Sequence, residues 1–305
     1  MKLQEIIHEF HTEFTNLNLP ASTEDLRDLE QAIGGLPDQA LILYKDHNGS
    51  AQVSQARDRK LAARLMPIGE MIATQATLTK VLGGLPAIGP LAWMWSDDNS
   101  NYCGVYTGGP LRGWLCILDH EEPILTPAFR SIESFTSRLL TEARRKEQSS
   151  ARDILSVPRE VPGSVPDEVN DEPDLRLALH FREQYNHESR EAMRWLCAVC
   201  SICLTPFGNT ADVTAFLEDR DTRIPEAAVR LLEIRNWKAG TEQLEKLARE
   251  GRPNGDSAAM RLLARMKTAD AYQSIARLKG HLQGQKLKAL EMWTRPGIHL
   301  QPPSW

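Results

Sequence analysis

The 305-residue sequence has no long uninterrupted apolar run. Its longest uncharged stretch, residues 81–96, is broken by glycines and prolines and is too short to cross a bilayer. The N-terminal segment has acids at Glu5, Glu9 and Glu13, which interrupt the apolar centre that a secretory signal peptide requires. We therefore expect no membrane partner and a cytoplasmic location.

The sequence also has few cysteines and a small net charge. Five cysteines in a chain expected in the cytoplasm are predicted to be thiols and not disulfides. The net charge is only -5, and a protein held on nucleic acid by phosphate contacts would need a basic face. We therefore expect no nucleic-acid partner, and the sequence does not predict an oligomeric state.

The sequence also lacks a complete catalytic or metal-binding pattern. Cys197, Cys200 and Cys203 resemble the start of a cluster-binding run, but they lie in an apolar helical stretch without a fourth cysteine, so buried thiols are favoured over a metal site. Residues 97–101 match the first ligands of a calcium loop, but the glycine and glutamate that should follow are absent. No Ser-His-Asp or Cys-His spacing is present. We expect no catalytic residues, metal or cofactor, and therefore a protein that is not an enzyme.

Periodicity divides the chain into two domains. Period-2 aromatic and apolar runs at 91–95, 102–106 and 114–118, separated by turn residues, predict an antiparallel meander. Residues 51–64 are polar and are predicted to form a surface excursion. The predicted fold class is an α+β N-terminal domain, with an antiparallel sheet flanked by helices, followed by an all-α C-terminal domain. The predicted boundaries are 1–146 for the α+β domain, 147–174 for a linker, 175–293 for the helical domain and 294–305 for a tail.

The linker is predicted from composition. Residues 151–174 contain four prolines and seven acids against two arginines. Their net charge of -5 equals that of the whole chain, so the acidic and basic side chains of the remaining residues are equal in number. Such a segment is typical of an extended tether.

The helical domain contains a repeated pattern. The runs AMRWL at 192–196, AVRLL at 228–232 and AMRLL at 259–263 are spaced by 36 and 31 residues, and each precedes a second helical segment. Helix pairs at this period indicate a short solenoid and resemble HEAT-type repeats. An irregular helical bundle is the alternative.

A helical hairpin over residues 19–50 organises the N-terminal domain. Ser22 or Thr23 is predicted to cap its first helix, and Asn48-Gly49 ends the second. This stretch, with LMPIGEM at 65–71 and FRSIESF at 129–135, resembles the SUKH superfamily. The resemblance implies an α+β domain of the kind found in fungal cell-wall regulators and bacterial immunity proteins.

Aromatic and acidic residues around the predicted sheet are the candidate partner-binding site. In one interpretation the tryptophans are core and the acids lie in solvated turns. In the other they form an aromatic anchor with an acidic rim that suits a basic protein partner. The candidates are Trp93, Trp95, Asp97, Asp98, Trp114, Asp119, Glu121 and Glu122.

The resemblance implies an immunity protein. Its partner would be a cognate secreted bacterial toxin, for example a nuclease effector of a type VI secretion system, neutralised by stoichiometric occlusion. The alternative is a regulatory scaffold whose helical repeats hold another protein.

Overall fold

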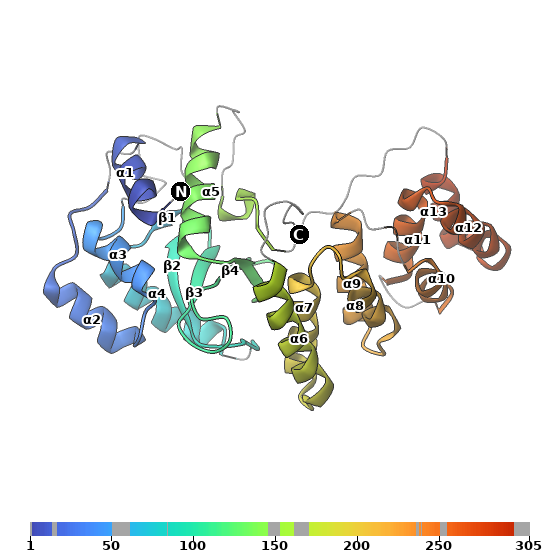
Figure 1. Cartoon of the computed structure of the whole chain (residues 1–305), viewed down its shortest axis with the longest axis horizontal. Coiled ribbons are helices and arrows are strands. Elements are labelled where there is room, and N and C mark those ends of the chain that lie inside the picture. The colour runs from blue at the N-terminus through green and yellow to red at the C-terminus, as the bar shows by residue number, and fades with distance from the viewer. Residues whose placement is uncertain are drawn as a thin grey trace. The chain divides into compact units, whose positions relative to one another are not determined.

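The computed structural model describes residues 2–13, 17–50, 62–83, 85–145, 153–161, 171–235, 238, 240–250 and 255–295. The chain divides into two compact units, Met1–Val161 and Pro162–Trp305. Unit 1 contains a sheet with helices, and unit 2 is helical, which confirms the predicted order of an α+β domain and an all-α domain (Figure 1).

The elements of unit 1 are α1 (Leu3–Glu13), α2 (Thr23–Ile33), α3 (Asp38–Asp46), β1 (Arg64–Leu65), α4 (Ile68–Val81), β2 (Leu91–Ser96), β3 (Tyr102–Tyr106), β4 (Leu115–Leu118), β5 (Pro127–Phe129), α5 (Ile132–Arg144) and the short helix η1 (Ile154–Ser156). Those of unit 2 are α6 (Asp171–His187), α7 (Glu191–Leu204), α8 (Thr210–Thr214), η3 (Ala215–Glu218), α9 (Arg223–Ile234), α10 (Thr241–Glu250), α11 (Gly255–Met266), α12 (Ala269–His281) and α13 (Gly284–Trp293).

The helical hairpin of unit 1 has the helix cap and the turn expected from its sequence. Ser22 caps α2 in a capping box with Asp25. After α3, the Asn48 side chain accepts a hydrogen bond from the backbone N–H of Ile68 at 2.9 Å, which satisfies a free donor at the start of α4. Gly49 has a φ of +74°, and a Cβ there would lie 2.5 Å from the nitrogen of Pro67. The Asn-Gly pair therefore allows α3 to cross closely over the segment that leads into α4.

The sheet is an antiparallel meander in the order β1-β2-β3-β4-β5, as predicted for its three central strands. Trp93 pairs with Gly104, whereas Trp95 pairs with Cys103, so Met94 is an extra residue in β2. Because Cys103 and Gly104 face opposite sides of β3, this bulge places Trp93 and Trp95 on opposite faces. A Cβ on Gly104 would lie 2.7 Å from the Trp93 ring, so the glycine makes room for that indole.

Both faces and one edge of the sheet are covered. Trp95 packs against Phe135 of α5, with ring centroids 5.0 Å apart. The two-residue β1 leaves part of the β2 edge unpaired. There the Gln75 side chain of α4 donates to the carbonyl of Leu91 at 3.0 Å and accepts from the N–H of Trp93 at 3.2 Å. A side chain thus replaces the missing strand partner.

Two segments of unit 1 differ from expectation. Residues 51–61 of the predicted surface excursion lie outside the described residues, but Ala62, Ala63 and Arg64 are buried, which corrects the prediction for that end. Part of the predicted linker is also packed. Ile154, Val157 and Val161 are almost completely buried in unit 1.

The linker segment is also held by polar contacts. Glu160 accepts a hydrogen bond from the backbone N–H of Arg130 at 2.8 Å, and its own N–H bonds to the carbonyl of Ala128 in β5. Residues 153–161 therefore extend the folded unit, because their apolar side chains find burial that overall composition did not indicate. Residues 147–152 and 162–170 of the predicted linker and residues 296–305 of the tail lie outside the described residues. Residues 171–174 belong to α6, which corrects that end of the predicted linker.

The helices of unit 2 stack in two rows. In one row α7 packs on α9, α9 on α11, and α11 on α13. In the other row η3 packs on α10, and α10 packs on α12. α6 packs on α7, and its Tyr185 ring meets Phe216 of η3, so α6 begins the second row. Each helix pair therefore packs mainly on the pairs next to it in the sequence.

Ion pairs link successive helix pairs at a nearly constant sequence separation. Arg223 bonds to Glu191 and Arg277 bonds to Glu245, each 32 residues apart. Lys286 pairs with Asp256 in the same way. The arginine of the AMRLL run at 259–263 makes a similar contact. Arg261 of α11 donates two hydrogen bonds to the buried Glu233 of α9. Arg261, the arginine of this run, therefore joins α11 to α9.

Within the described part of the chain, every helix is too short or too polar to serve as a membrane span.

Candidate functional site

The structure places the central tryptophans of the predicted binding site in the core. Trp93 is 3% exposed and Trp95 is 2% exposed. Both indoles are packed inside unit 1 because the Met94 bulge directs them to two covered faces. This corrects the expectation of an exposed aromatic anchor at Trp93 and Trp95 and leaves them the structural role that the sequence also allowed.

Asp97 is a buried organiser of the turn between β2 and β3. Its Oδ1 accepts from the N–H of Asn99 at 2.8 Å and of Asn101 at 3.2 Å. Its Oδ2 accepts from the Asn101 side chain at 2.8 Å and from the N–H of Ile154 at 3.3 Å. The carboxylate therefore fixes the turn and holds the segment after α5, so it does not form an acidic rim.

Asp98 belongs to a second network, which is centred on the buried Arg64. Arg64, with a side chain only 1% exposed, donates to the Asp98 carboxylate at 2.8 Å and also pairs with Glu70 of α4. Burying a guanidinium is costly unless its donors are satisfied, and these two acids satisfy them. Asp98 is an exposed residue, as predicted, but its carboxylate is engaged by Arg64 and stabilises the β1–α4 region.

The other four predicted residues are more accessible but do not gather in one place. Trp114 is half-buried just before β4, whereas Asp119 follows the end of that strand. At 3.3 Å per residue, the two positions are about 16 Å apart along the strand. Glu121 and Glu122 are exposed in the loop after Asp119. An acidic loop remains at this end of the sheet, without an aromatic neighbour from the predicted set.

Unit 2 carries an open polar groove that the sequence analysis did not single out. The groove has a volume of about 610 Å³ and lies between α10 and α12. Buried Glu245 forms its floor, where Arg249 and Arg277 hold the carboxylate and lower its pKa, Arg277 having the larger effect. Its lining residues are Thr241, Glu242, Glu245, Lys246, Arg249, Glu250, Asp270, Gln273, Ser274 and Arg277.

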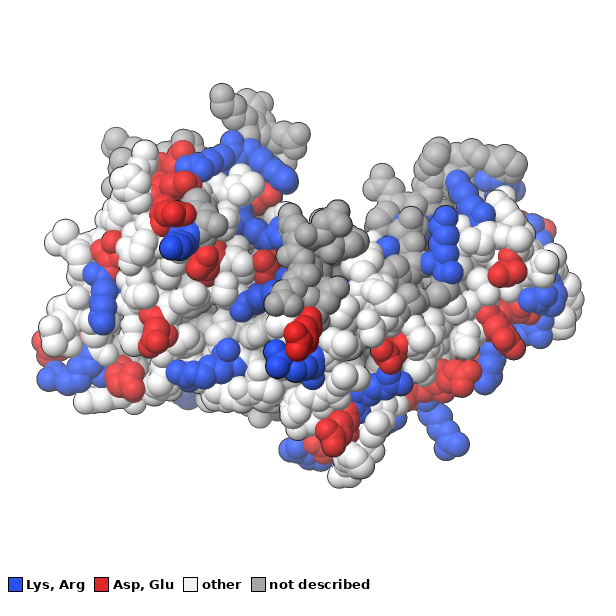
Figure 2. Space-filling view, in the orientation of Figure 1, with Lys and Arg blue, Asp and Glu red and all other residues white. Residues whose placement is uncertain are grey.

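The groove presents both signs of charge. The right-hand end of Figure 2, where α10–α13 lie, shows acidic and basic side chains interspersed and no large field of one sign. Arg249 and Arg277 line the groove, and Tyr272 of α12, outside the lining, is 57% exposed. Tyrosine and arginine are the residue types that most often anchor protein interfaces. The chemistry of this surface suits a polar protein partner better than a small apolar ligand.

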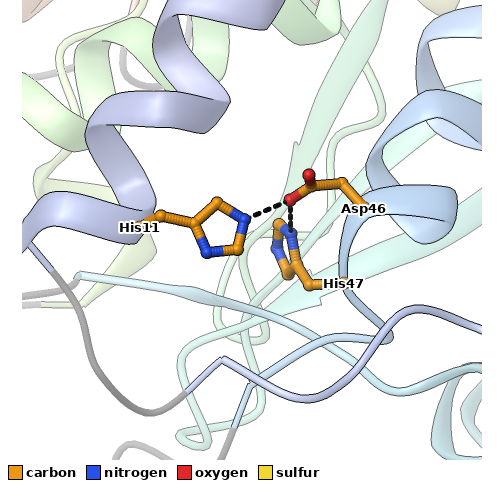
Figure 3. Close-up of side chains that lie close together, drawn as sticks. All are labelled: His11, Asp46 and His47. Atoms are coloured by element: carbon orange, nitrogen blue, oxygen red, sulfur yellow. Dashed lines mark hydrogen bonds and ion pairs between the residues drawn. The ribbon is translucent and has the colours of Figure 1, made fainter.

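A separate cluster in unit 1 joins two histidines to one carboxylate (Figure 3). His11 Nε2 lies 2.6 Å and His47 Nδ1 lies 3.0 Å from the same Asp46 oxygen, Oδ2. Burial lowers the pKa of His47, although its hydrogen bond and charge interaction with Asp46 act in the opposite direction. The sequence analysis missed this cluster because His11 lies 35 residues before Asp46 and no local pattern connects them.

All five cysteines are buried free thiols. Cys197, Cys200 and Cys203 lie within α7, as the apolar helical stretch indicated. Burial raises the pKa of the Cys116 thiol to about 12 and also raises that of Cys197. Such thiols are poor nucleophiles because only the thiolate reacts.

Comparison with known proteins does not assign the chain to a family. No family model matches the chain, and no curated protein matches its sequence. The fold and the surface chemistry define a two-unit protein with an α+β domain and stacked helix pairs, and any function must be argued from them.

Proposed function

We propose that this protein is an immunity protein that binds a cognate bacterial protein toxin and neutralises it by stoichiometric occlusion. The observation that carries the proposal is the open groove between α10 and α12, a polar surface of mixed charge lined by Arg249 and Arg277. Stacked helix pairs commonly bind partners through such extended surfaces. The groove therefore suits recognition of a protein partner.

The choice of a toxin as the partner rests on the sequence resemblance to the SUKH superfamily. The order of elements in unit 1 agrees with it: a helical hairpin, a strand leading into a helix, a meander and a closing helix. The residues that carry the resemblance have clear structural roles, since Asn48 accepts a hydrogen bond from the first N–H of α4 and Gly49 permits a close approach to the backbone of residues 65–67. The mixed charge of the groove favours no particular toxin class, so a nuclease effector stays a prediction from the sequence.

The test is co-expression with the product of the neighbouring gene. Expression of that product alone should stop growth, and this chain should restore growth and co-purify with it in a 1:1 complex. Lys246→Glu reverses an exposed charge in the groove and should weaken the complex at least about 10-fold, as loss of a moderate interface contact does. Arg220→Glu changes an exposed arginine outside the groove and serves as the matched control.

A scaffold is the second candidate, because the same groove could hold a partner that is not toxic. A stable complex with a harmless host protein, and no growth arrest to relieve, would favour the scaffold and contradict the immunity function. Equal weakening by Lys246→Glu and Arg220→Glu would show that the groove is not the interface.

A further inference from the structure

Two histidines and one aspartate meet at the junction of α1 and α3. His11 lies on α1, Asp46 is the last residue of α3, and His47 follows it. One ligand atom from each residue lies within 4.8 Å of the other two, and both imidazole rings point at the carboxylate (Figure 3). Among the described residues this is the group whose side chains could hold a metal ion.

The donor set is suited to zinc. Neutral imidazole nitrogen and carboxylate oxygen are common zinc ligands, and three protein ligands with water at the fourth position form a complete tetrahedral site. In such a site, ligand atoms are about 3.3 Å apart when metal–ligand bonds are 2.0–2.1 Å. The contacts of 2.6 Å and 3.0 Å to Asp46 Oδ2 must open slightly, and the two imidazole nitrogens, which lie within 4.8 Å of each other, must also come to this separation.

One ligand is held rigidly, while another can adjust. The His47 side chain is 7% exposed, and its backbone N–H is fixed to the carbonyl of Leu43 at 2.9 Å. The His11 side chain is 48% exposed and lies on the solvent side of the cluster, where it can rotate toward an ion. Asp46 is 30% exposed, which leaves a route for ion entry and room for a water ligand.

We propose that His11, Asp46 and His47 bind one zinc ion, which fastens α1 to the end of α3. In the loaded site each neutral imidazole would present its unprotonated nitrogen to the ion and carry its proton on the other ring nitrogen, so the ion would take the place of the two hydrogen bonds to Asp46. This site is independent of the partner-binding groove in unit 2, and it departs from the sequence-based expectation that the chain binds no metal.

The test is zinc titration of the full chain, prepared without a polyhistidine tag, by isothermal calorimetry. We expect one zinc per chain, and His11→Ala should weaken binding more than about 100-fold, since even loss of a residue that only supports a ligand costs 10–100-fold. His11 is exposed, so its replacement leaves the fold intact. Asp46→Asn should also weaken binding.

His8→Ala is the matched control. His8 is exposed one turn before His11 on the same helix, and its replacement should change zinc affinity less than about twofold. Cobalt bound in place of zinc should give visible absorption bands in the wild type and in His8→Ala, and not in His11→Ala. Thermal unfolding should shift upward with zinc in the same two proteins.

Three outcomes would overturn the proposal. The first is the absence of stoichiometric zinc binding by the wild type. The second is loss of binding in His8→Ala with retention in Asp46→Asn, which would assign the ion to an exposed His8–His11 pair. The third is retention in His11→Ala with loss in Cys200→Ser, which would place the ion among the thiols of α7.

Discussion

Glu233 provides the sharpest test of how unit 2 is held together. Its side chain is 0% exposed at the end of α9. Arg261 of the next repeat donates two hydrogen bonds to it, at 2.8 Å and 2.7 Å, and Arg265 lies 3.7 Å away. Glu233→Gln keeps the size of the side chain but removes the charge that these two arginines share.

The loss of stability expected for Glu233→Gln follows from the burial of the ion pair. Breaking a fully buried ion pair costs about 3–5 kcal/mol. Arg261 is 35% exposed and Arg265 is 14% exposed, so water can partly solvate the released arginines. We therefore expect Glu233→Gln to destabilise unit 2 by about 2 kcal/mol.

Glu191→Gln is the matched control. Glu191 also bonds to an arginine of the next repeat, Arg223, at 2.8 Å, but its side chain is 83% exposed. Its replacement should cost at most about 1 kcal/mol, including the loss of an acid at the start of α7. Hydrogen exchange in a urea series, followed by mass spectrometry of peptides from α9 and α11, measures both variants within unit 2.

A double-mutant cycle between Glu233→Gln and Arg261→Gln should give a coupling of at least about 0.5 kcal/mol, because the two side chains are in direct contact. Equal effects of Glu233→Gln and Glu191→Gln, with no coupling to Arg261, would refute the argument that the buried pair joins the repeats.

Three further predictions address other parts of the molecule. Gly49→Ala should destabilise unit 1 by at least about 2 kcal/mol more than Gly35→Ala, because both glycines have positive φ but only Gly49 is crowded by backbone atoms. Urea unfolding measures the free energy of unfolding of both variants, and equal losses of stability would contradict the prediction. Because the pKa of Glu245 is lowered, its stabilising contribution is present above the unfolded pKa of about 4.3 and is lost as pH falls through the folded pKa. Glu245→Gln should therefore flatten the acid dependence of hydrogen exchange in α10 and α12, and an unchanged pH slope would count against this prediction. The five thiols should react with Ellman's reagent only in denaturant, and rapid labelling of the native chain would show that their burial is not maintained.

The predictions that succeeded depended on local patterns. The alternating apolar run at 91–95 and the turn residues around it were sufficient to predict β2 and its neighbours, because side chains alternate between the faces of a strand. The helix cap at Ser22 was also readable, since it satisfies backbone donors within its own turn.

The failures involved contacts between distant residues. The bulge at Met94 reverses the facing of Trp95 relative to Trp93 and has no signature in the sequence. Arg64 was assigned to a polar surface segment, but Glu70 and Asp98 satisfy its guanidinium in the interior. The His11–Asp46 contact joins two helices, so a scan for closely spaced ligands could not find it.

Direct binding of the purified full chain to the purified product of the neighbouring gene tests the proposed function most directly. Isothermal calorimetry should give a 1:1 stoichiometry, weaker affinity for Lys246→Glu and unchanged affinity for Arg220→Glu, with loss of the toxin's activity at one equivalent. Absence of heat and of a complex at micromolar concentrations, with toxin activity unaffected, would contradict the proposal.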